Sequence, residues 1–195
     1  MKCLVLFDFD GTLTSKDSFI SFLRAVNSPL KFIAGFIFLT PVMICYKAGL
    51  IPNWKAKQLV ISYFFRGMKA DIFFERCREF SEQDIRPMVK QTAMKKLNTH
   101  LNEGHKVVVV TASLEAYMEP WCNKTGVELI ATRLEIKDEK ITGNYDGRNC
   151  FGAEKAKRVR EKYALESFEK IIAYGDSRGD REMLELADEK HYRVF

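Results

Sequence analysis

The stretch Leu4–Thr14, LVLFDFDGTLT, holds the strongest structural signal in this chain of 195 residues. Its first four residues are apolar, which is typical of a strand buried on both faces of a sheet. Asp8 and Asp10 follow this strand, and Gly11 supplies a turn. Two carboxylates this close repel each other unless a cation or a shared proton stabilises them. We therefore predict a Mg²⁺ site at the carboxyl end of the strand, where open α/β sheets bind ligands. The alternative is that the two acids only mark a solvated turn.

The remaining pattern predicts an α/β fold that has a flavodoxin-like or Rossmann-like parallel-sheet core and an all-helical insertion. Residues 15–88 show helical spacing and no strand pattern, whereas buried strands return at 106–110 and 170–174 with helices around them. Strands that alternate with helices indicate a parallel sheet with right-handed crossovers. We therefore predict two domains, an α/β core from residues 1–14 plus 89–195 and a helical cap from residues 15–88.

The ends of the sheet are less clearly marked. The first strand is expected from Lys2 to Phe7, and a hairpin is expected over residues 127–145 because two apolar runs flank a turn there. A short final strand is expected from His191 to Phe195.

Composition indicates a folded protein and argues against several classes. The net charge of +5 is too small to indicate a nucleic-acid partner. The five cysteines are far apart and include no C-x-x-C pair, which suits a reducing cytosol and gives no reason to propose zinc or disulfides. The first strand begins almost at the N-terminus, so we expect no secretory signal peptide and a cytoplasmic location. Nothing in the sequence indicates the oligomeric state.

One segment complicates this picture. Phe32–Tyr46, FIAGFIFLTPVMICY, contains no charged residue and lies between Lys31 and Lys47. It is shorter than the about 20 residues that an α-helix needs to span a bilayer, and Pro41 would kink such a helix. Three interpretations stay open: a buried or substrate-lining helix of the cap, a segment in peripheral contact with the inner face of a membrane, and a true span.

Each predicted buried strand is followed by polar residues. In a parallel sheet the carboxyl ends of neighbouring strands meet, so these residues are expected to gather in one site. A lysine that opens a helix between the last two groups is expected to join them. The residues are Asp8 and Asp10, Thr111 to Ser113, Lys155, and Asp176 with Asp180.

The order DFDGT…[T/S]…K…GDxxxD resembles the haloacid dehalogenase superfamily, and its motifs extend over the whole chain. A large helical insertion between the first two motifs, with only a hairpin between the second and third, looks like the phosphoserine-phosphatase-like subfamily. The tripeptide Thr111-Ala112-Ser113 resembles a group of small bacterial hydrolases of the phosphatidylglycerophosphatase C type. Some of these act on phosphatidylglycerol phosphate at the inner membrane.

The resemblance implies a role for each acid. Asp8 would be the nucleophile that forms an aspartyl-phosphate, with the role of a passive metal ligand as the alternative. Asp10 would protonate the leaving alkoxide and then activate water, or else only orient its neighbours. Asp8, Asp176 and the backbone carbonyl of Asp10 would bind Mg²⁺.

Other residues would surround the phosphate. Thr111 would offer its hydroxyl and Ala112 its backbone N–H, while Lys155 would balance the negative charge. Lys157 is a rival for this role, although the glycine three residues before Lys155 fits the family pattern better, and both lysines could be solvated helix charges.

Two residues near the strand ends would support this arrangement. Asp180 would hold Lys155 or a metal-bound water, with a helix N-cap as the alternative, and Ser177 would assist it.

The cap is where the resemblance weakens. Asp17 falls where phosphoserine phosphatases place a glutamate that binds the substrate amine, but it could equally be a helix N-terminal charge. Lys57 is the nearest basic residue to the position of their cap arginine, and a lysine is not an equivalent carboxylate clamp. Phosphoserine is therefore not favoured as the substrate.

These observations predict a Mg²⁺-dependent phosphomonoester hydrolase. The apolar segment favours a phosphorylated lipid or another phosphate with an apolar tail as the substrate. The alternatives are a small soluble phosphate of an amino acid, sugar or nucleotide, and a non-catalytic phosphate-binding protein of this fold. Transfer of the phosphoryl group to an acceptor other than water stays open, because it would use the same motifs.

Overall fold

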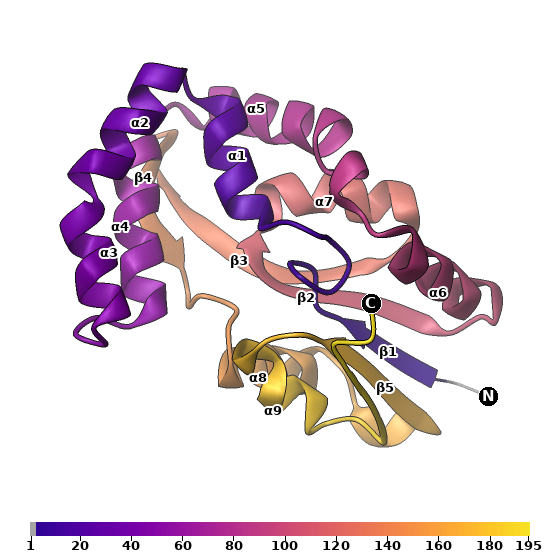
Figure 1. Ribbon diagram of the computed structural model, residues 1–195. Coiled ribbons are helices and arrows are strands. Elements are labelled where there is room, and N and C mark those ends of the chain that lie inside the picture. Colours follow the sequence, from indigo (N-terminus) through magenta and orange to yellow (C-terminus); the bar gives the residue numbers. More distant parts are fainter. Residues whose placement is uncertain (1–2) are drawn as a thin grey trace.

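Six strands form one sheet in the order β4-β3-β2-β1-β5-β6 in the computed structural model, which describes residues 3–195 (Figure 1). Strands β1, β2, β3, β5 and β6 pair in parallel, whereas β4 is antiparallel to β3. The strands are β1 Cys3–Phe7, β2 Lys106–Leu114, β3 Glu128–Lys137, β4 Lys140–Asp146, β5 Lys170–Gly175 and β6 Glu189–Tyr192. From β1 the chain first adds β2 and β3 on one side and later β5 and β6 on the other, so the strand order switches between β1 and β5. Open α/β sheets bind ligands at such a switch point.

The apolar run of β1 packs on both faces of the sheet because successive side chains in a strand point to opposite sides. Cys3, Val5 and Phe7 belong to one hydrophobic cluster. Leu4 and Leu6 belong to a second cluster on the other face. All five residues are fully buried, so β1 is the centre of both halves of the core.

Helices cover both faces of the sheet (Figure 1). Helices α6 and α7 contribute to the cluster that contains Phe7, and α8 and α9 contribute to the cluster that contains Leu6. These helices are α6 Gln91–Asn102, α7 Glu115–Thr125, α8 Ala153–Lys162 and α9 Arg181–Leu184. Three short 3₁₀ helices complete the described chain: η1 Arg86–Met88, η2 Leu165–Ser167 and η3 Arg178–Asp180.

The insertion between β1 and β2 begins with five helices. They are α1 Ser18–Val26, α2 Pro29–Phe38, α3 Thr40–Lys47, α4 Asn53–Phe65 and α5 Ala70–Gln83. In Figure 1, α2, α3 and α4 lie together at one side of the molecule, away from the helices that cover the sheet. A Cβ at Gly35 of α2 would lie 2.4 Å from the ring of Phe64, so the missing side chain lets α2 pack closely on α4.

The apolar segment predicted at Phe32–Tyr46 forms parts of α2 and α3, which bend by 49° at Leu39. Among the described residues, no single helix is long and apolar enough to cross a bilayer. Of the helices described, only α2 and α3 taken together, as a bent pair, have the length and the composition for it.

The predicted α/β class with a helical insertion is confirmed, and the order of the parallel strands is that of Rossmann-type folds rather than flavodoxin. The boundaries of two strands differ from the prediction. β2 runs on to Leu114, which pairs with Thr132 after an irregularity in the register, so Thr111 to Ser113 lie within the strand. The final strand is Glu189–Tyr192 rather than His191–Phe195, because Arg193 adopts a positive φ that ends it.

Lys2, expected in the first strand, lies outside the described residues. The division into domains at residues 14 and 88 stays a prediction.

Candidate active site

Asp8 follows β1 directly and is held in place by three contacts. Its backbone N–H donates to the carbonyl of Tyr174 in β5, which sets the end of β1 against the end of β5. The hydroxyl of Thr12 donates to Oδ2 at 3.2 Å, and the ammonium of Lys155 donates to Oδ1 at 2.5 Å. Burial raises the pKa of Asp8 to about 7, although the charge of Lys155 opposes this shift.

Lys155 is a buried cation between two buried carboxylates. Its Nζ lies 2.5 Å from Asp8 Oδ1 and 2.7 Å from Asp180 Oδ1, and its side chain is 2% exposed. Burial alone would lower the pKa of Lys155, but the two carboxylates outweigh it and the pKa is raised. Lys157, the rival predicted from sequence, is exposed and pairs with Glu161 one helical turn away. The structure therefore brings Lys155, and not Lys157, to the strand ends.

Asp180 links Lys155 to the loop after β5. Its Oδ1 accepts from Lys155, and its Oδ2 accepts from the hydroxyl and backbone N–H of Ser177 at 2.8 and 2.9 Å. Ser177 is the N-cap of η3, and Asp180 completes its capping box. The Asp180 side chain makes no cap hydrogen bond to α9, so of the two roles proposed for Asp180 its contacts show the first, holding Lys155. With its oxygens used in this way, Asp180 is a positioning residue in this geometry.

The remaining carboxylates suit a divalent cation. Oxygens of Asp8, Asp176 and Asp180 lie within 4.8 Å of one another. Oδ1 of Asp176 is buried and has no hydrogen-bond partner among the described residues. A Cβ at Gly11, where φ is +88°, would lie 2.3 Å from Asp176 Oδ2, so a glycine is required for this carboxylate to approach the loop after β1. An unpaired buried oxygen of Asp176 close to the carboxylate of Asp8 fits Mg²⁺, which prefers oxygen ligands.

Asp10 accepts two hydrogen bonds that sequence reasoning did not find. The backbone N–H of Ser18 donates to Oδ1 at 2.7 Å, and the hydroxyl of Ser113 donates to Oδ2 at 2.5 Å. Ser113 also contacts the hydroxyl of Ser18, which contacts that of Tyr117. Burial raises the pKa of Asp10, and the nearby charge of Asp17 adds to this effect. A carboxyl group with a raised pKa is suited to giving and taking a proton near neutral pH.

The signal for Ser113 was present in the sequence, because it is the last residue of the T-A-S tripeptide. Its partners could not be inferred, because Ser18 and Tyr117 are 95 and 4 residues away from it in the chain and meet it only through the packing of α1 and α7 on β2.

We expect Ser113→Ala to lower kcat by roughly tenfold while changing KM by less than about twofold. The substitution removes a hydrogen bond that orients the Asp10 carboxylate and leaves the group less well fixed for proton transfer. The measurement is steady-state phosphate release. Ser167→Ala, which removes a surface hydroxyl bonded only to Ala164, is the control and should leave both constants unchanged.

Thr111 and Ala112 lie beside these carboxylates. Thr111 is 1% exposed, and its hydroxyl oxygen accepts from the backbone N–H of Ser113 at 3.0 Å. The carbonyl of Ala112 accepts from Lys57 of α4 at 2.8 Å, which joins the cap to β2. Their predicted phosphate contacts stay predictions, and the structure places both residues on the wall of the same pocket as Asp8.

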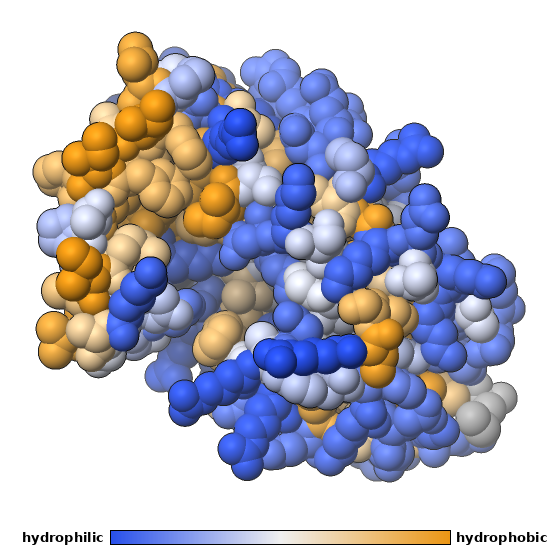
Figure 2. All heavy atoms as spheres, viewed as in Figure 1, coloured by the Kyte–Doolittle hydropathy of each residue, from blue (hydrophilic) through white to orange (hydrophobic). Residues whose placement is uncertain are grey.

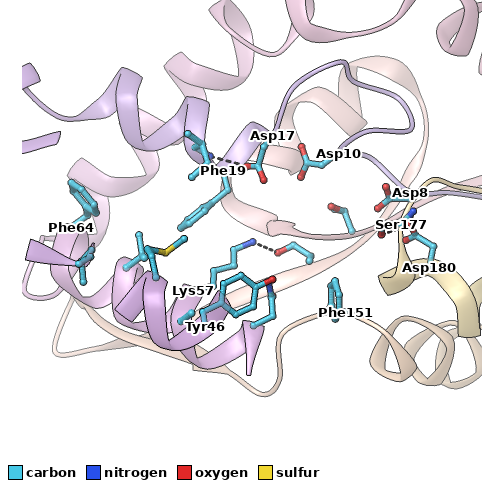
Figure 3. Close-up of a pocket in the computed structure, with 18 of the residues that line it drawn as sticks. Asp8, Asp10, Asp17, Phe19, Tyr46, Lys57, Phe64, Phe151, Ser177 and Asp180 are labelled. Atoms are coloured by element: carbon cyan, nitrogen blue, oxygen red, sulfur yellow. Dashed lines mark hydrogen bonds between the residues drawn. The ribbon is translucent and has the colours of Figure 1, made fainter. Parts of the chain in front are cut away.

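The pocket, of about 470 Å³, extends from the strand ends to the cap (Figure 3). Its polar end is formed by Asp8, Asp10, Thr111, Lys155 and Asp180. Its other end is apolar, and the residues there come from α1 to α4: Phe19, Ile20, Phe36, Leu39, Met43, Val60 and Phe64. A cavity of this size suits a small-molecule substrate.

The two predicted substrate residues also line this pocket. The carboxylate of Asp17 accepts from the backbone N–H of Ile20 and caps α1, which is the alternative the sequence left open. Lys57 lies 4.5 Å from the ring centroid of Phe19, and burial lowers its pKa (Figure 3). Asp17 is thus held at the start of α1, and Lys57 is held against β2 and Phe19.

Comparison with known proteins agrees with this geometry. CicA of Caulobacter vibrioides (strain NA1000 / CB15N) is 38% identical over 194 residues, covering 98% of this chain and 86% of CicA. Histidinol-phosphatase of Neisseria meningitidis serogroup C is 29% identical over 119 residues, covering 57% of this chain and 54% of that protein. A solved structure of substrate-bound phosphoserine phosphatase has a TM-score of 0.72 at 19% identity, covering 98% of this chain and 86% of that chain, and so shares the fold.

The resemblance inferred from the motif order is confirmed, together with the phosphoserine-phosphatase-like fold. The match to the description "haloacid dehalogenase-like hydrolase" covers residues 5–185, and the chain therefore belongs to this family.

Proposed function

We propose that this haloacid dehalogenase-like phosphatase hydrolyses a small phosphomonoester through a phosphorylated Asp8, with Mg²⁺ bound beside it. The observation that supports this most directly is the meeting of Asp8, Lys155 and Asp176 at adjacent strand ends, on the floor of a pocket or next to it. When bound, Mg²⁺ would offset negative charge on the substrate phosphate, with Asp8, Asp176 and the Asp10 carbonyl as its ligands.

In the first half-reaction, a carboxylate oxygen of Asp8 attacks phosphorus as the bond from phosphorus to the substrate oxygen breaks. Asp10 donates a proton to the departing oxygen, and the raised pKa of its carboxyl group favours the protonated form that this step needs. Lys155 donates a hydrogen bond to Asp8 and balances charge as the phosphoryl group arrives. The products are the free alcohol and a phosphorylated Asp8.

In the second half-reaction, Asp10 is a carboxylate and takes a proton from water. The water oxygen attacks phosphorus, the bond to Asp8 breaks, and inorganic phosphate leaves. Ser113 and Ser18 hold the Asp10 carboxylate during both steps through their hydrogen bonds to its two oxygens.

We expect Mg²⁺ removal by a chelator to abolish phosphate release, and Mg²⁺ addition to restore it. In Asp176→Asn, half-maximal activity should need at least about tenfold more Mg²⁺, because one anionic ligand is lost. Mg²⁺ should also raise the melting temperature of the unmodified protein, because it binds the folded state alone, and should raise it less in the variant. Asp146→Asn, which changes an exposed carboxylate paired with Arg133, is the control.

Two observations bear on the chemical class of the substrate. The relationship to histidinol-phosphatase and the phosphoserine phosphatase fold favour a small soluble phosphate. The apolar end of the pocket favours a leaving group that has an uncharged, partly apolar portion. A soluble phosphomonoester with such a portion satisfies both observations.

A series of straight-chain alkyl phosphates tests this directly. Each added methylene that enters the apolar end should raise kcat/KM about threefold to fourfold, until the pocket is filled. Phosphoserine and histidinol phosphate are the comparison substrates. A flat response along the series, with a strong preference for phosphoserine, would show that the apolar wall does not contact the substrate.

A phosphorylated lipid is the second candidate. It is favoured by the position of Phe36, Leu39 and Met43 on helices whose opposite side is exposed, so an acyl chain could extend along the wall of the pocket. Turnover of micellar phosphatidylglycerol phosphate well above that of the longest soluble alkyl phosphate would support this candidate.

A further inference from the structure

The helices α2 and α3 are apolar on two opposite sides. Phe36, Leu39, Met43 and Tyr46 recur at helical spacing and line the pocket. On the other side, Leu30, Ile33, Ile37 and Ile44 are 82%, 56%, 70% and 61% exposed. We name these last four residues the outer face. A helix that is apolar all round is normally buried in a core or in a membrane.

The outer face is part of a larger exposed apolar surface. Figure 2 shows hydrophobic side chains gathered over α2 and α3, in contrast with the hydrophilic remainder of this view. Phe38, which directly follows Ile37, and Leu50, which follows α3, are 71% and 74% exposed. A contiguous exposed apolar surface of this kind marks an interaction site.

The charged residues of the segment that forms this surface have a single sign. From Ser18 to Ala70 all seven charged residues are basic, although the whole chain has a net charge of only +5. Lys47 ends α3, and Lys55 lies in the first turn of α4, whereas no acidic residue occurs anywhere in this range. An apolar face on helices whose charged residues are all basic matches the interface of a bilayer that contains anionic lipids.

We propose that the outer face of α2 and α3 docks on an anionic lipid bilayer, with the two helices lying in the interface. The bend at Leu39 divides the segment into two helices that are each too short to span a bilayer, which suits shallow insertion. The pocket lies on the opposite side of the same helices, so docking would bring its apolar wall next to the membrane. This inference does not depend on the identity of the substrate or on the proposed chemistry.

Vesicle flotation tests the proposal with the whole chain. We expect binding to vesicles of phosphatidylcholine with phosphatidylglycerol, weaker binding to phosphatidylcholine alone, and weakening by salt. The double variant Ile33→Gln/Ile37→Gln should bind anionic vesicles roughly 100-fold more weakly, because two apolar side chains no longer enter the lipid. Lys47→Gln should reduce binding by roughly fivefold.

The matched control is Ile72→Gln/Phe74→Gln, which replaces two exposed apolar residues on α5, where acidic residues are present. It should bind vesicles like the unmodified protein. All variants should hydrolyse para-nitrophenyl phosphate normally, since the altered residues lie outside the pocket, and this shows that they are folded.

Three results would overturn the proposal: no binding of the unmodified protein to anionic vesicles at low salt, equal binding by Ile33→Gln/Ile37→Gln, or equal loss of binding in the α5 control. A fourth is that the unmodified protein sediments as a dimer and the α2 variant as a monomer, which would show that a second copy covers the outer face. Loss of hydrolysis by Asp8→Asn with vesicle binding retained would leave the docking proposal intact.

Discussion

Asp8→Asn is expected to lower phosphate release by about 10⁴-fold or more while the protein stays folded. The amide cannot attack phosphorus, so the covalent route is lost and only slow uncatalysed attack by water remains. The measurement is phosphate release under saturating Mg²⁺, together with mass spectrometry of the acid-quenched enzyme. The unmodified protein should gain the mass of one phosphoryl group on the peptide that contains Asp8, and the variant should not.

The same substitution should not reduce stability, and this separates a loss of chemistry from a loss of fold. Burial raises the pKa of Asp8 to about 7, well above its value in an unfolded chain. The ionised carboxylate therefore destabilises the metal-free folded protein at pH 8, by on the order of a few kcal/mol. With asparagine at this position, Lys155 still pairs with Asp180. The melting temperature of Asp8→Asn without Mg²⁺ should be unchanged or higher, and a marked fall would contradict this account of the charges.

Lys155→Met is expected to lower kcat by about 10³-fold and to reduce the free energy of unfolding by about 3 kcal/mol near pH 8. The variant leaves Asp8 and Asp180 buried without their shared cation, and breaking a buried ion pair in this way typically costs about 3–5 kcal/mol. Denaturant unfolding without Mg²⁺ measures the second effect.

The pH dependence of the free energy of unfolding shows whether lost charge pairing causes the stability deficit of Lys155→Met. Without the cation, the pKa of Asp8 rises further above its value in the unfolded chain, and the pKa of Asp180, which Lys155 holds below its usual value, rises as well. The folded variant therefore takes up protons more readily than the unmodified folded protein does. Its stability deficit should therefore shrink as the pH falls from 8 to 5. Lys157→Met, which changes the exposed rival two residues away, should alter stability by less than about 0.5 kcal/mol. A deficit that is constant with pH would indicate lost packing rather than lost charge pairing.

The order of elements could be predicted from the sequence because it depends on local pattern. The fully apolar β1 and the run Lys106–Val110 are recognisable as buried strands, and helical spacing identifies α1 to its exact ends, Ser18 and Val26. The extension of β2 to Leu114 was missed because Thr111, Ala112 and Ser113 interrupt the apolar pattern. They remain in the strand because β3 supplies a partner after an irregular register, which a local pattern cannot reveal.

The environment of the apolar segment Phe32–Tyr46 also could not be predicted from the local pattern. The segment's length and Pro41 argued against a span, but no feature of the sequence separated a cap helix from a membrane contact. The fold bends the segment at Leu39, and Gly35 lets α2 pack on Phe64. The segment therefore lines the pocket with one side and exposes the other, whereas its contact with a membrane stays a proposal.

The sequence by itself determined which acids meet. Asp8 and Asp176 each follow a buried parallel strand, and the carboxyl ends of such strands lie on one edge of the sheet. The glycine three residues before Lys155 already favoured it over Lys157, but only the tertiary structure decided that Lys155 is buried between two carboxylates and that Ser18 and Ser113 hold Asp10. These choices depend on which side of α8 faces the sheet and on contacts between residues about a hundred positions apart. Such contacts form through the packing of the whole core, so the local sequence pattern does not predict them.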